Sequence, residues 1–178
     1  MTAHQAALEA LTRYFGYDSF RPGQQGIVEA LLAGRDVLGV MPTGAGKSVC
    51  YQIPAALSPG MTLVISPLIS LMRDQVDALN DLGLPAAFIN TTQTPDEQAM
   101  VFAQAAAGQI KLLYVAPERL ETGRFRDFAA RTPISLIAVD EAHCVSQWGQ
   151  DFRSSYLGIG DFIAGLPQRP PVGAFTAT

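Results

Sequence analysis

Residues 43–48 read Thr-Gly-Ala-Gly-Lys-Ser and have the residue types of a phosphate-binding loop. Gly44 and Gly46 permit backbone angles that turn several N–H groups toward one concavity. Lys47 is placed to reach the β- and γ-phosphates of a nucleotide, and Ser48 to supply an oxygen ligand to Mg²⁺. The segment therefore predicts binding of a nucleoside triphosphate, and the alternative is a glycine turn that arose by chance.

Two carboxylates end an apolar run much later in the chain, where Ser-Leu-Ile-Ala-Val at 135–139 is followed by Asp140 and Glu141. Acids at the carboxyl end of a strand lie where open α/β sheets bind their ligands. Asp140 is then placed to hold Mg²⁺ through water, and Glu141 to orient or deprotonate the water that attacks the γ-phosphate. The pair favours hydrolysis over simple binding, although acids also occur at ordinary helix N-termini. His143, taken alone, is more often structural than catalytic.

Six short apolar runs predict the strands that position these groups. Their residues are nearly all apolar and do not alternate with polar ones, as expected for parallel strands that helices cover on both faces. The sequence therefore predicts a three-layer α/β domain with a mostly parallel central sheet. The predicted strands are 36–41, 61–66, 86–90, 111–115, 134–139 and 171–175.

Helices are predicted between the strands. One follows the phosphate loop over about 48–57, so that its positive N-terminal end faces the bound phosphates. Apolar residues at helical spacing predict another over 71–83, and Thr-Pro-Asp-Glu at 94–97 has the cap, proline and acid of a helix start. The segment 123–131 gives no clear prediction.

The composition fits one domain with a buried core, because the chain has 178 residues, of which 48% are hydrophobic. Residues 1–35 predict a helical preface and residues 36–178 the domain itself. The sequence shows neither a membrane-spanning run nor a secretory signal, so we expect a cytoplasmic protein outside the membrane. Cys50 and Cys144 have no partner at metal-ligand spacing and predict buried, reduced thiols. The net charge of −4 gives no general attraction to nucleic acid, although a local arginine patch can still bind phosphates.

In their order and spacing, these motifs resemble the first RecA-like motor domain of a RecQ-type superfamily 2 DNA helicase. The resemblance covers nearly the whole chain and includes the DEAH sequence at 140–143. It implies a RecA-like P-loop NTPase fold, ATP and Mg²⁺ as cofactors, and single-stranded and partly duplex DNA as partners. It rests on the segments 15–17, 20–24, 41–48, 66–75, 114–120, 140–156 and 176–178.

The segment before the phosphate loop implies a site for adenine. By the resemblance, Tyr17 stacks on the base while Arg21 and Gln24 contact its edge, which makes ATP the preferred nucleotide. These types suit the roles, since an aromatic face stacks and an amide both donates and accepts hydrogen bonds. Alternatively, Tyr17 and Phe20 pack the helical preface. The implied nucleotide-binding set is Tyr17, Arg21, Gln24, Thr43, Gly44, Ala45, Gly46, Lys47 and Ser48, with Lys47, Asp140 and Glu141 as catalytic residues and Ser48 and Asp140 as magnesium ligands.

The segment 144–153 resembles the aromatic-rich loop that links DNA contact to ATP hydrolysis in this family. Aromatic side chains beside an arginine suit stacking on unpaired bases with a phosphate contact. Without the flanking DEAH sequence, Trp148 and Phe152 would be assigned to the core. Ser66 and Ser70 are implied to contact the DNA backbone, or else to cap a helix. The set implied in DNA contact or coupling is Ser66, Pro67, Ser70, His143, Gln147, Trp148, Phe152, Arg153, Thr176 and Thr178.

A few positions depart from the family pattern. Met41 stands where the general phosphate-loop pattern has its first glycine, and Ala45 replaces a middle glycine, which costs little if its backbone angles are ordinary. Gln150 stands where histidine is frequent, and residues 154–155 are serines where a proline and an acid are common. Neither of the last two changes removes a proposed catalytic group, but both bear on how the loop couples to DNA.

The resemblance also implies a longer protein, with a second RecA-like domain, a zinc-binding part and a winged-helix part beyond Thr178. In this family the arginine that completes the site comes from the second motor domain. We therefore expect little or no hydrolysis and no unwinding by these residues alone. The intact protein is expected to unwind DNA in the 3′-to-5′ direction in repair or recombination.

Three alternatives to this interpretation stay open. An RNA helicase of the same superfamily shares most of the motifs, and the aromatic-rich loop is what favours DNA. A P-loop nucleotidase or small-molecule kinase would use the same phosphate loop, but no arginine-rich lid segment is evident for a kinase. A nucleotide-dependent interaction module without activity would not need Glu141.

Overall fold

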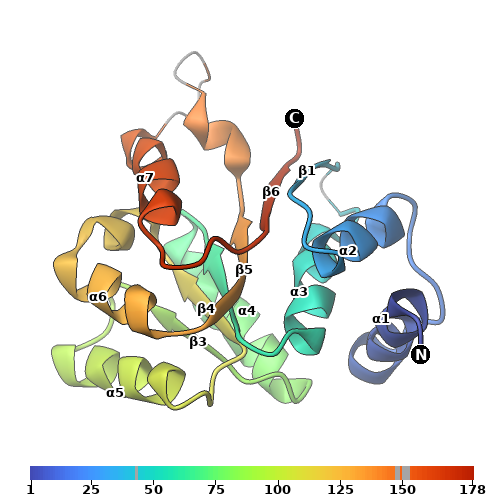
Figure 1. Ribbon diagram of the computed structural model, residues 1–178, viewed down its shortest axis with the longest axis horizontal. Helices are drawn as coiled ribbons and strands as arrows, with labels where there is room; N and C mark the ends of the chain where they lie inside the picture. The colour runs from blue at the N-terminus through green and yellow to red at the C-terminus, as the bar shows by residue number, and fades with distance from the viewer. Residues whose placement is uncertain (43, 147–148, 150–152) are drawn as a thin grey trace.

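A parallel β-sheet forms the centre of the protein, for which a computed structural model describes residues 1–42, 44–146, 149 and 153–178. These residues form six strands in the order β1-β6-β5-β2-β4-β3, and every neighbouring pair is parallel (Figure 1). Each predicted strand is confirmed, with ends shifted by at most one residue. The strands are β1 (Val37–Val40), β2 (Met61–Ile65), β3 (Ala86–Ile89), β4 (Leu112–Val115), β5 (Ile134–Val139) and β6 (Val172–Thr176).

Helices cover both faces of this sheet, which confirms the predicted three-layer α/β fold (Figure 1). On one face lie α2 (Gln24–Leu32), α3 (Lys47–Leu57) and α4 (Ile69–Asp81), and on the other lie α5 (Pro95–Ala106), α6 (Gly123–Arg131) and α7 (Ile159–Ala164). Short 3₁₀ turns complete the connections: η2 (Pro117–Glu121), η3 (Ala142–Val145) and η4 (Ser154–Gly158).

The strands bury side chains on both faces, which explains why their sequences are apolar throughout. In β2, Val64 packs in the cluster under α3 and α4, while Leu63 and Ile65 pack in the cluster under α5, α6 and α7. All three side chains are fully buried. A strand covered on both faces has no position at which a polar side chain could reach water.

The preface consists of α1 (Ala3–Ala10), a short π-helical turn η1 (Leu11–Phe15) and α2. Its helical content is as predicted. Leu11 and Val28 pack with Val49 and Ile53 of α3 in a separate small core. The preface therefore braces the helix that begins at the phosphate loop.

Local signals explain two further helix starts. At α5, Thr94 Oγ1 accepts a hydrogen bond from the Glu97 N–H at 3.2 Å, and a Glu97 carboxylate oxygen accepts one from the Thr94 N–H at 2.8 Å, so the predicted capping box is confirmed. The segment 123–131, which had no clear prediction, is α6. Thr122 caps it, and Phe125 and Phe128 bury its inner face.

The edge strand β1 is the exception to full coverage. Leu38 and Val40 are 68% and 58% exposed, whereas Gly39 between them faces Phe175 and Ile27. One face of β1 therefore packs under the helices and the other is open to solvent. Separately, no helix in the described ranges is long and apolar enough to cross a membrane.

We predict that the central and edge strands differ sharply in their contribution to stability. Leu63→Ala should lower the free energy of unfolding by about 2–5 kcal/mol, because it leaves a cavity in β2 that the neighbours cannot fill. Leu38→Ala makes the same chemical change on the exposed side of β1 and should stay within about 0.5 kcal/mol of the parent. Urea denaturation of the two variants measures both values, and equal losses would contradict the layered core described above.

Candidate nucleotide-binding active site

The phosphate loop connects β1 to α3 and has the backbone geometry expected of its glycines. Gly44 and Gly46 have φ angles of 86° and 80°, in the left-handed region that a side chain disfavours. Gly46 caps α3, which begins at Lys47, so the ammonium group and the helix N-terminus lie at the same loop. Ala45 does not adopt a left-handed conformation, as predicted. Thr43 lies outside the described residues.

The floor of the loop is apolar and accounts for Met41. Its side chain is buried, its Sδ lies 3.7 Å from the Cys50 Sγ, and its N–H donates to the Thr176 carbonyl oxygen at 2.9 Å. Burial raises the pKa of the Cys50 thiol to about 12, so the thiol stays protonated. Cys50 and Cys144 are both buried, as predicted.

A pocket of about 310 Å³ adjoins the loop and gathers residues from the preface and from α3. Tyr17, Arg21 and Gln24 line it together with Gly46 and Ser48, so three positions that the resemblance assigned to adenine surround one cavity. The Tyr17 side chain is half exposed and is therefore available to a ligand. Phe20 instead packs against the core of the preface.

Arg21 and Gln24 are hydrogen-bonded to the phosphate loop itself. An Arg21 guanidinium N–H donates to the Gly44 carbonyl oxygen at 2.8 Å, and the Gln24 Nε2 donates to the Gly46 carbonyl oxygen at 3.0 Å. The Gln24 Oε1 accepts from the Arg21 N–H at 2.8 Å, which fixes the amide orientation. Because glycines have no side chains that could fix the loop, the Arg21 and Gln24 side chains stabilise its conformation from outside.

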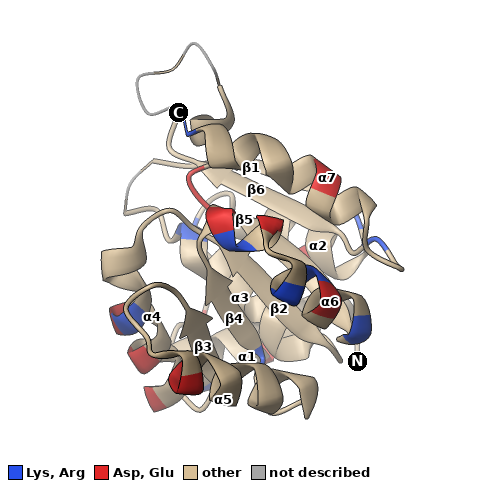
Figure 2. Ribbon diagram, turned by 90° about the vertical axis from the view of Figure 1, so that its left-hand side faces the viewer, with Lys and Arg blue, Asp and Glu red and all other residues tan. Residues whose placement is uncertain are grey.

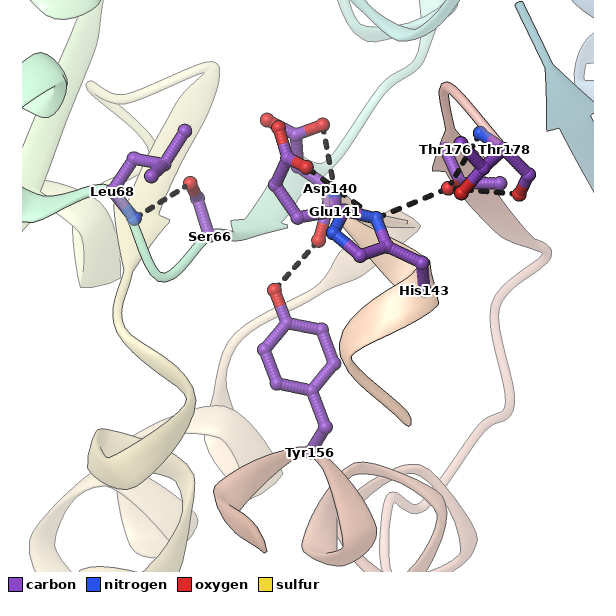
Figure 3. Close-up of polar contacts among 8 residues, drawn as sticks. All are labelled: Ser66, Leu68, Asp140, Glu141, His143, Tyr156, Thr176 and Thr178. Atoms are coloured by element: carbon purple, nitrogen blue, oxygen red, sulfur yellow. Dashed lines mark hydrogen bonds and ion pairs between the residues drawn. The ribbon is translucent and has the colours of Figure 1, made fainter. Parts of the chain in front are cut away.

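The two acids lie at the carboxyl end of β5, on the same edge of the sheet as the phosphate loop. Their carboxylates lie side by side in Figure 3, between the Ser66 turn and the Thr176–Thr178 segment. The Glu141 N–H donates to the Asp140 carboxylate at 3.0 Å, and the Tyr156 hydroxyl donates to the Asp140 carbonyl oxygen at 2.7 Å. Glu141 has a φ of 53° and is the single left-handed non-glycine residue among those described. Such strain is held by surrounding contacts and clusters at functional sites.

Electrostatics ties Asp140 to the loop. Burial is the main cause that raises the pKa of the Asp140 carboxyl, and the Glu141 charge adds to it, while the Glu141 N–H and the Lys47 ammonium act in the opposite direction. A divalent cation would relieve both the burial and the repulsion. Ser48 and Asp140 offer hard oxygen ligands, which suit Mg²⁺ when phosphates and waters complete its octahedron. Within the described ranges no group of three His, Cys, Asp or Glu side chains is placed to hold a metal ion.

His143 connects the acids to β6. Its Nδ1 lies 3.1 Å from the Thr176 Oγ1 and 3.5 Å from a Glu141 carboxylate oxygen (Figure 3). Thr176 Oγ1 in turn accepts from the Thr178 N–H at 3.3 Å and donates to the Thr178 carbonyl oxygen at 3.2 Å. The structure therefore brings Glu141, His143, Thr176 and Thr178 together, although they come from two separate segments.

Comparison with protein families identifies the family of the chain. A family model for DEAD/DEAH box helicases matches residues 21–178. The chain belongs to this family. The match begins at Arg21 in the pocket beside the phosphate loop and covers every strand of the helicase domain.

Relatives and solved structures agree with this family. The chain is 51% identical to the ATP-dependent DNA helicase RecQ of Haemophilus influenzae over 97% of its length, and 47% identical to that of Bacillus subtilis over 97%. It spans only 28% and 29% of those relatives. In fold it is similar to a hypothetical ATP-dependent RNA helicase from Sulfolobus tokodaii, with a TM-score of 0.72 and 21% identity over 98% of this chain and 50% of the other. The Mycobacterium smegmatis helicase Lhr gives a TM-score of 0.70 at 20% identity, over 97% of this chain and 24% of the other.

Two described residues that the resemblance assigned to DNA, Pro67 and Arg153, lie close together. Pro67 and Arg153 line a hollow of about 370 Å³ beyond β2, β3 and β4, with Asn90, Thr91 and Arg119. Figure 2 shows acidic and basic residues next to each other on α4 and α6, so binding of a polyanion here depends on individual arginines. Gln147, Trp148 and Phe152 lie outside the described residues, as does Gln150.

The two serines at the start of α4 do not occupy its cap position, which is Leu68. The Ser66 hydroxyl accepts from the Leu68 N–H at 3.2 Å and so stabilises the turn after β2 (Figure 3). Ser70 lies exposed in the first turn of the helix. The suggestion that either serine is a plain helix cap was wrong, and their contact with DNA stays a prediction.

Sequence reasoning missed a polar group under the site. Tyr51 of α3 and Tyr114 of β4 are almost completely buried, and their hydroxyls lie 3.4 Å apart. Tyr156, which bonds the Asp140 backbone, was also given no role. Tyr51 lies one helical turn after Lys47, on the same face of α3. Local spacing could not show that its hydroxyl contacts Tyr114 of β4, because the two residues are far apart in sequence.

We predict that Gln24 determines nucleotide affinity through the loop. Gln24→Ala removes the bonds to Arg21 and Gly46 and should weaken binding of Mg²⁺-ATP roughly tenfold, as expected for the loss of one or two buried hydrogen bonds. Gln25→Ala, at the exposed neighbouring position, is the matched control and should bind as the parent does. Titration with a fluorescent ATP analogue measures both, and equal affinities for the two variants would contradict this role.

Opposite pH effects are predicted for two aspartates. Asp140→Asn should raise the free energy of unfolding at neutral pH, because the folded-state pKa of Asp140 lies above its unfolded value and the buried charge is unfavourable. The difference in free energy of unfolding between Asp140→Asn and the parent should shrink as the pH falls through the raised pKa, because the Asp140 carboxyl of the folded parent then becomes protonated and neutral.

Asp36 supplies the contrast. Hydrogen bonds from the Arg169 guanidinium and the Val172 N–H lower the pKa of its carboxyl. It therefore stabilises the fold above its unfolded pKa, and that contribution is lost as the pH falls through the lowered folded pKa. Asp36→Asn should destabilise slightly at neutral pH, because the pair is exposed and screened. Denaturant titrations from neutral to acidic pH would contradict the assignment if both variants shifted stability in the same direction.

Proposed function

We propose that this chain binds Mg²⁺-ATP and supplies part of the DNA track of an ATP-dependent, RecQ-type DNA helicase. The longer protein would unwind DNA in the 3′-to-5′ direction in repair or recombination. The observation that carries the proposal is the pocket in which Tyr17, Arg21 and Gln24 meet the phosphate loop. Identity of 47–51% to two RecQ helicases supports the choice of DNA and of this subgroup.

The nucleotide-binding residues divide the work between base and phosphates. Tyr17 stacks on adenine at the open side of the pocket, and Arg21 and Gln24 contact its edge, for which they must exchange hydrogen bonds with the loop carbonyls. The loop N–H groups and the N-terminus of α3 receive the phosphates. Lys47 binds the β- and γ-phosphates and places the terminal group toward the acids.

The acids perform the hydrolytic step. Mg²⁺, when bound, would neutralise phosphate charge as it develops in the transition state. Ser48 and Asp140 would hold it, and the cation would offset the burial and the Glu141 charge that raise the pKa of Asp140. Glu141, whose backbone has a left-handed φ of 53°, accepts the proton of the attacking water.

DNA contact and coupling are assigned to the loops beyond β2, β5 and β6. Ser66, Pro67 and Ser70 lie along the backbone of a single strand, with Arg153 at the hollow beside them. Trp148 and Phe152, with Gln147, stack on unpaired bases. Through His143, the Thr176–Thr178 segment senses the state of Glu141.

A second RecA-like domain of the same protein would complete the site and supply the arginine that stabilises the transition state. Residues 1–178 alone should therefore hydrolyse ATP very slowly. A cytoplasmic location belongs to the same proposal.

The test is Mg²⁺-ATP turnover by the longer protein that contains this chain, with and without single-stranded DNA. We expect stimulation by DNA, and a loss of about 100-fold or more in Glu141→Gln with nucleotide binding retained. Strand displacement on substrates with 3′ or 5′ overhangs tests the direction. Stimulation by RNA and not by DNA would favour an RNA helicase, and turnover indifferent to both would leave a P-loop nucleotidase.

A further inference from the structure

The buried polar group between α3 and β4 joins two cavities that the proposed mechanism leaves separate. Gln52 is 7% exposed and lines the pocket beside the phosphate loop, one helical turn beyond Ser48. Its Nε2 donates to the Tyr114 hydroxyl at 3.5 Å, and that hydroxyl lies 3.4 Å from the Tyr51 hydroxyl. Polar atoms here have no water to replace a lost partner, so the group is sensitive to small changes.

Tyr114 leads directly to the second cavity. It is the penultimate residue of β4, and the segment after the strand brings Ala116, Glu118 and Arg119 to the hollow that Pro67 and Arg153 also line. The carbonyl oxygen of Val115 accepts from the Ser66 N–H at 3.0 Å, so the end of β4 also holds the turn after β2. A displacement of Tyr114 is therefore transmitted to both walls of the hollow.

Other routes between the cavities are less direct. The Tyr51 ring packs on Phe175 of β6, with ring centroids 5.6 Å apart. This contact leads to Thr176 at the carboxyl end of β6, and not to the second cavity. Arg21 and Gln24 reach only the phosphate loop. Gln52 and Tyr114 form a hydrogen bond that joins the two cavities more directly. The Gln52 side chain lines the pocket beside the phosphate loop, and Tyr114 lies two residues before Ala116, which lines the second hollow.

We propose that Gln52 and Tyr114 are positioning residues that couple the nucleotide pocket to the hollow formed by Pro67, Arg119 and Arg153. This rests on the proposed function, in which the first cavity receives ATP and the second a single strand of nucleic acid. Base binding beside Gln52 changes the distance to the Tyr114 hydroxyl and with it the position of the 116–119 segment.

The geometry suits a coupling element more than a rigid brace. Both contacts lie at the long end of hydrogen-bond distances, where a shift of a few tenths of an ångström makes or breaks the bond. Coupling requires an element with two arrangements that the two ligands favour differently. In this proposal the two arrangements of the pair are the bonded one, which the structure shows, and a separated one.

The experiment measures the dissociation constant of a non-hydrolysable Mg²⁺-ATP analogue for the longer protein that contains this chain, with and without a single-stranded DNA oligonucleotide. The ratio of the two constants is the coupling, and we expect about fivefold or more for the parent. Tyr114→Phe deletes only the hydroxyl, so it should fold and should bind the analogue without DNA within about twofold of the parent, yet its ratio should fall to about one. Tyr14→Phe, in the preface, is the matched hydroxyl deletion and should keep the parent's ratio.

A second variant makes the result specific to the pair. Gln52→Met should also abolish the ratio, and the double variant should behave as either single variant does, because both remove the same link. The inference is overturned if Tyr114→Phe keeps the parent's ratio, if the two losses add, or if the parent binds both ligands with a ratio of one. A parent that binds no analogue or no oligonucleotide contradicts the proposed function itself, and this inference with it.

Discussion

The parallel direction of all the described strands is the constraint on which the site depends. Parallel pairing brings every carboxyl end to one edge of the sheet, so loops from distant parts of the sequence meet there. The phosphate loop, the Ser66 turn, the acids after β5 and Thr176 at the end of β6 are neighbours for this reason. Hydrogen bonds such as those of Met41 with Thr176 and of Asp140 with Ile65 therefore join segments that are far apart in sequence.

The phosphate loop illustrates a conflict between binding and rigidity. Glycines let the backbone approach phosphates, but they also leave the loop without side chains that could fix it. The structure resolves this from outside the loop, with Arg21 and Gln24 bonded to its carbonyl oxygens and Met41 bonded to the end of β6. The residues that resemble base-reading positions are thereby hydrogen-bonded to the backbone of the phosphate loop.

The acids show a second conflict, between stability and function. Asp140 is partly buried and carries a raised pKa, and Glu141 holds a left-handed backbone, so both are unfavourable in the free protein. Neighbouring contacts from Tyr156 and His143 keep them in place. A cation between phosphate and carboxylate would relieve this electrostatic cost, which is why the site is complete only with its ligand.

The sequence by itself determined the strands, the fold class and the identity of the loop and the acids, because these follow from local patterns: apolar runs, glycines before a lysine, and carboxylates after a strand. It did not determine α6, whose start lacks an acidic capping box, nor the second role of Arg21 and Gln24. Only the tertiary structure decided that Gln52 faces the nucleotide pocket while bonding Tyr114, and that His143 joins Glu141 to Thr176. Such pairs depend on the order of strands in the sheet, and strand order is a property of long-range packing that no short stretch of sequence contains.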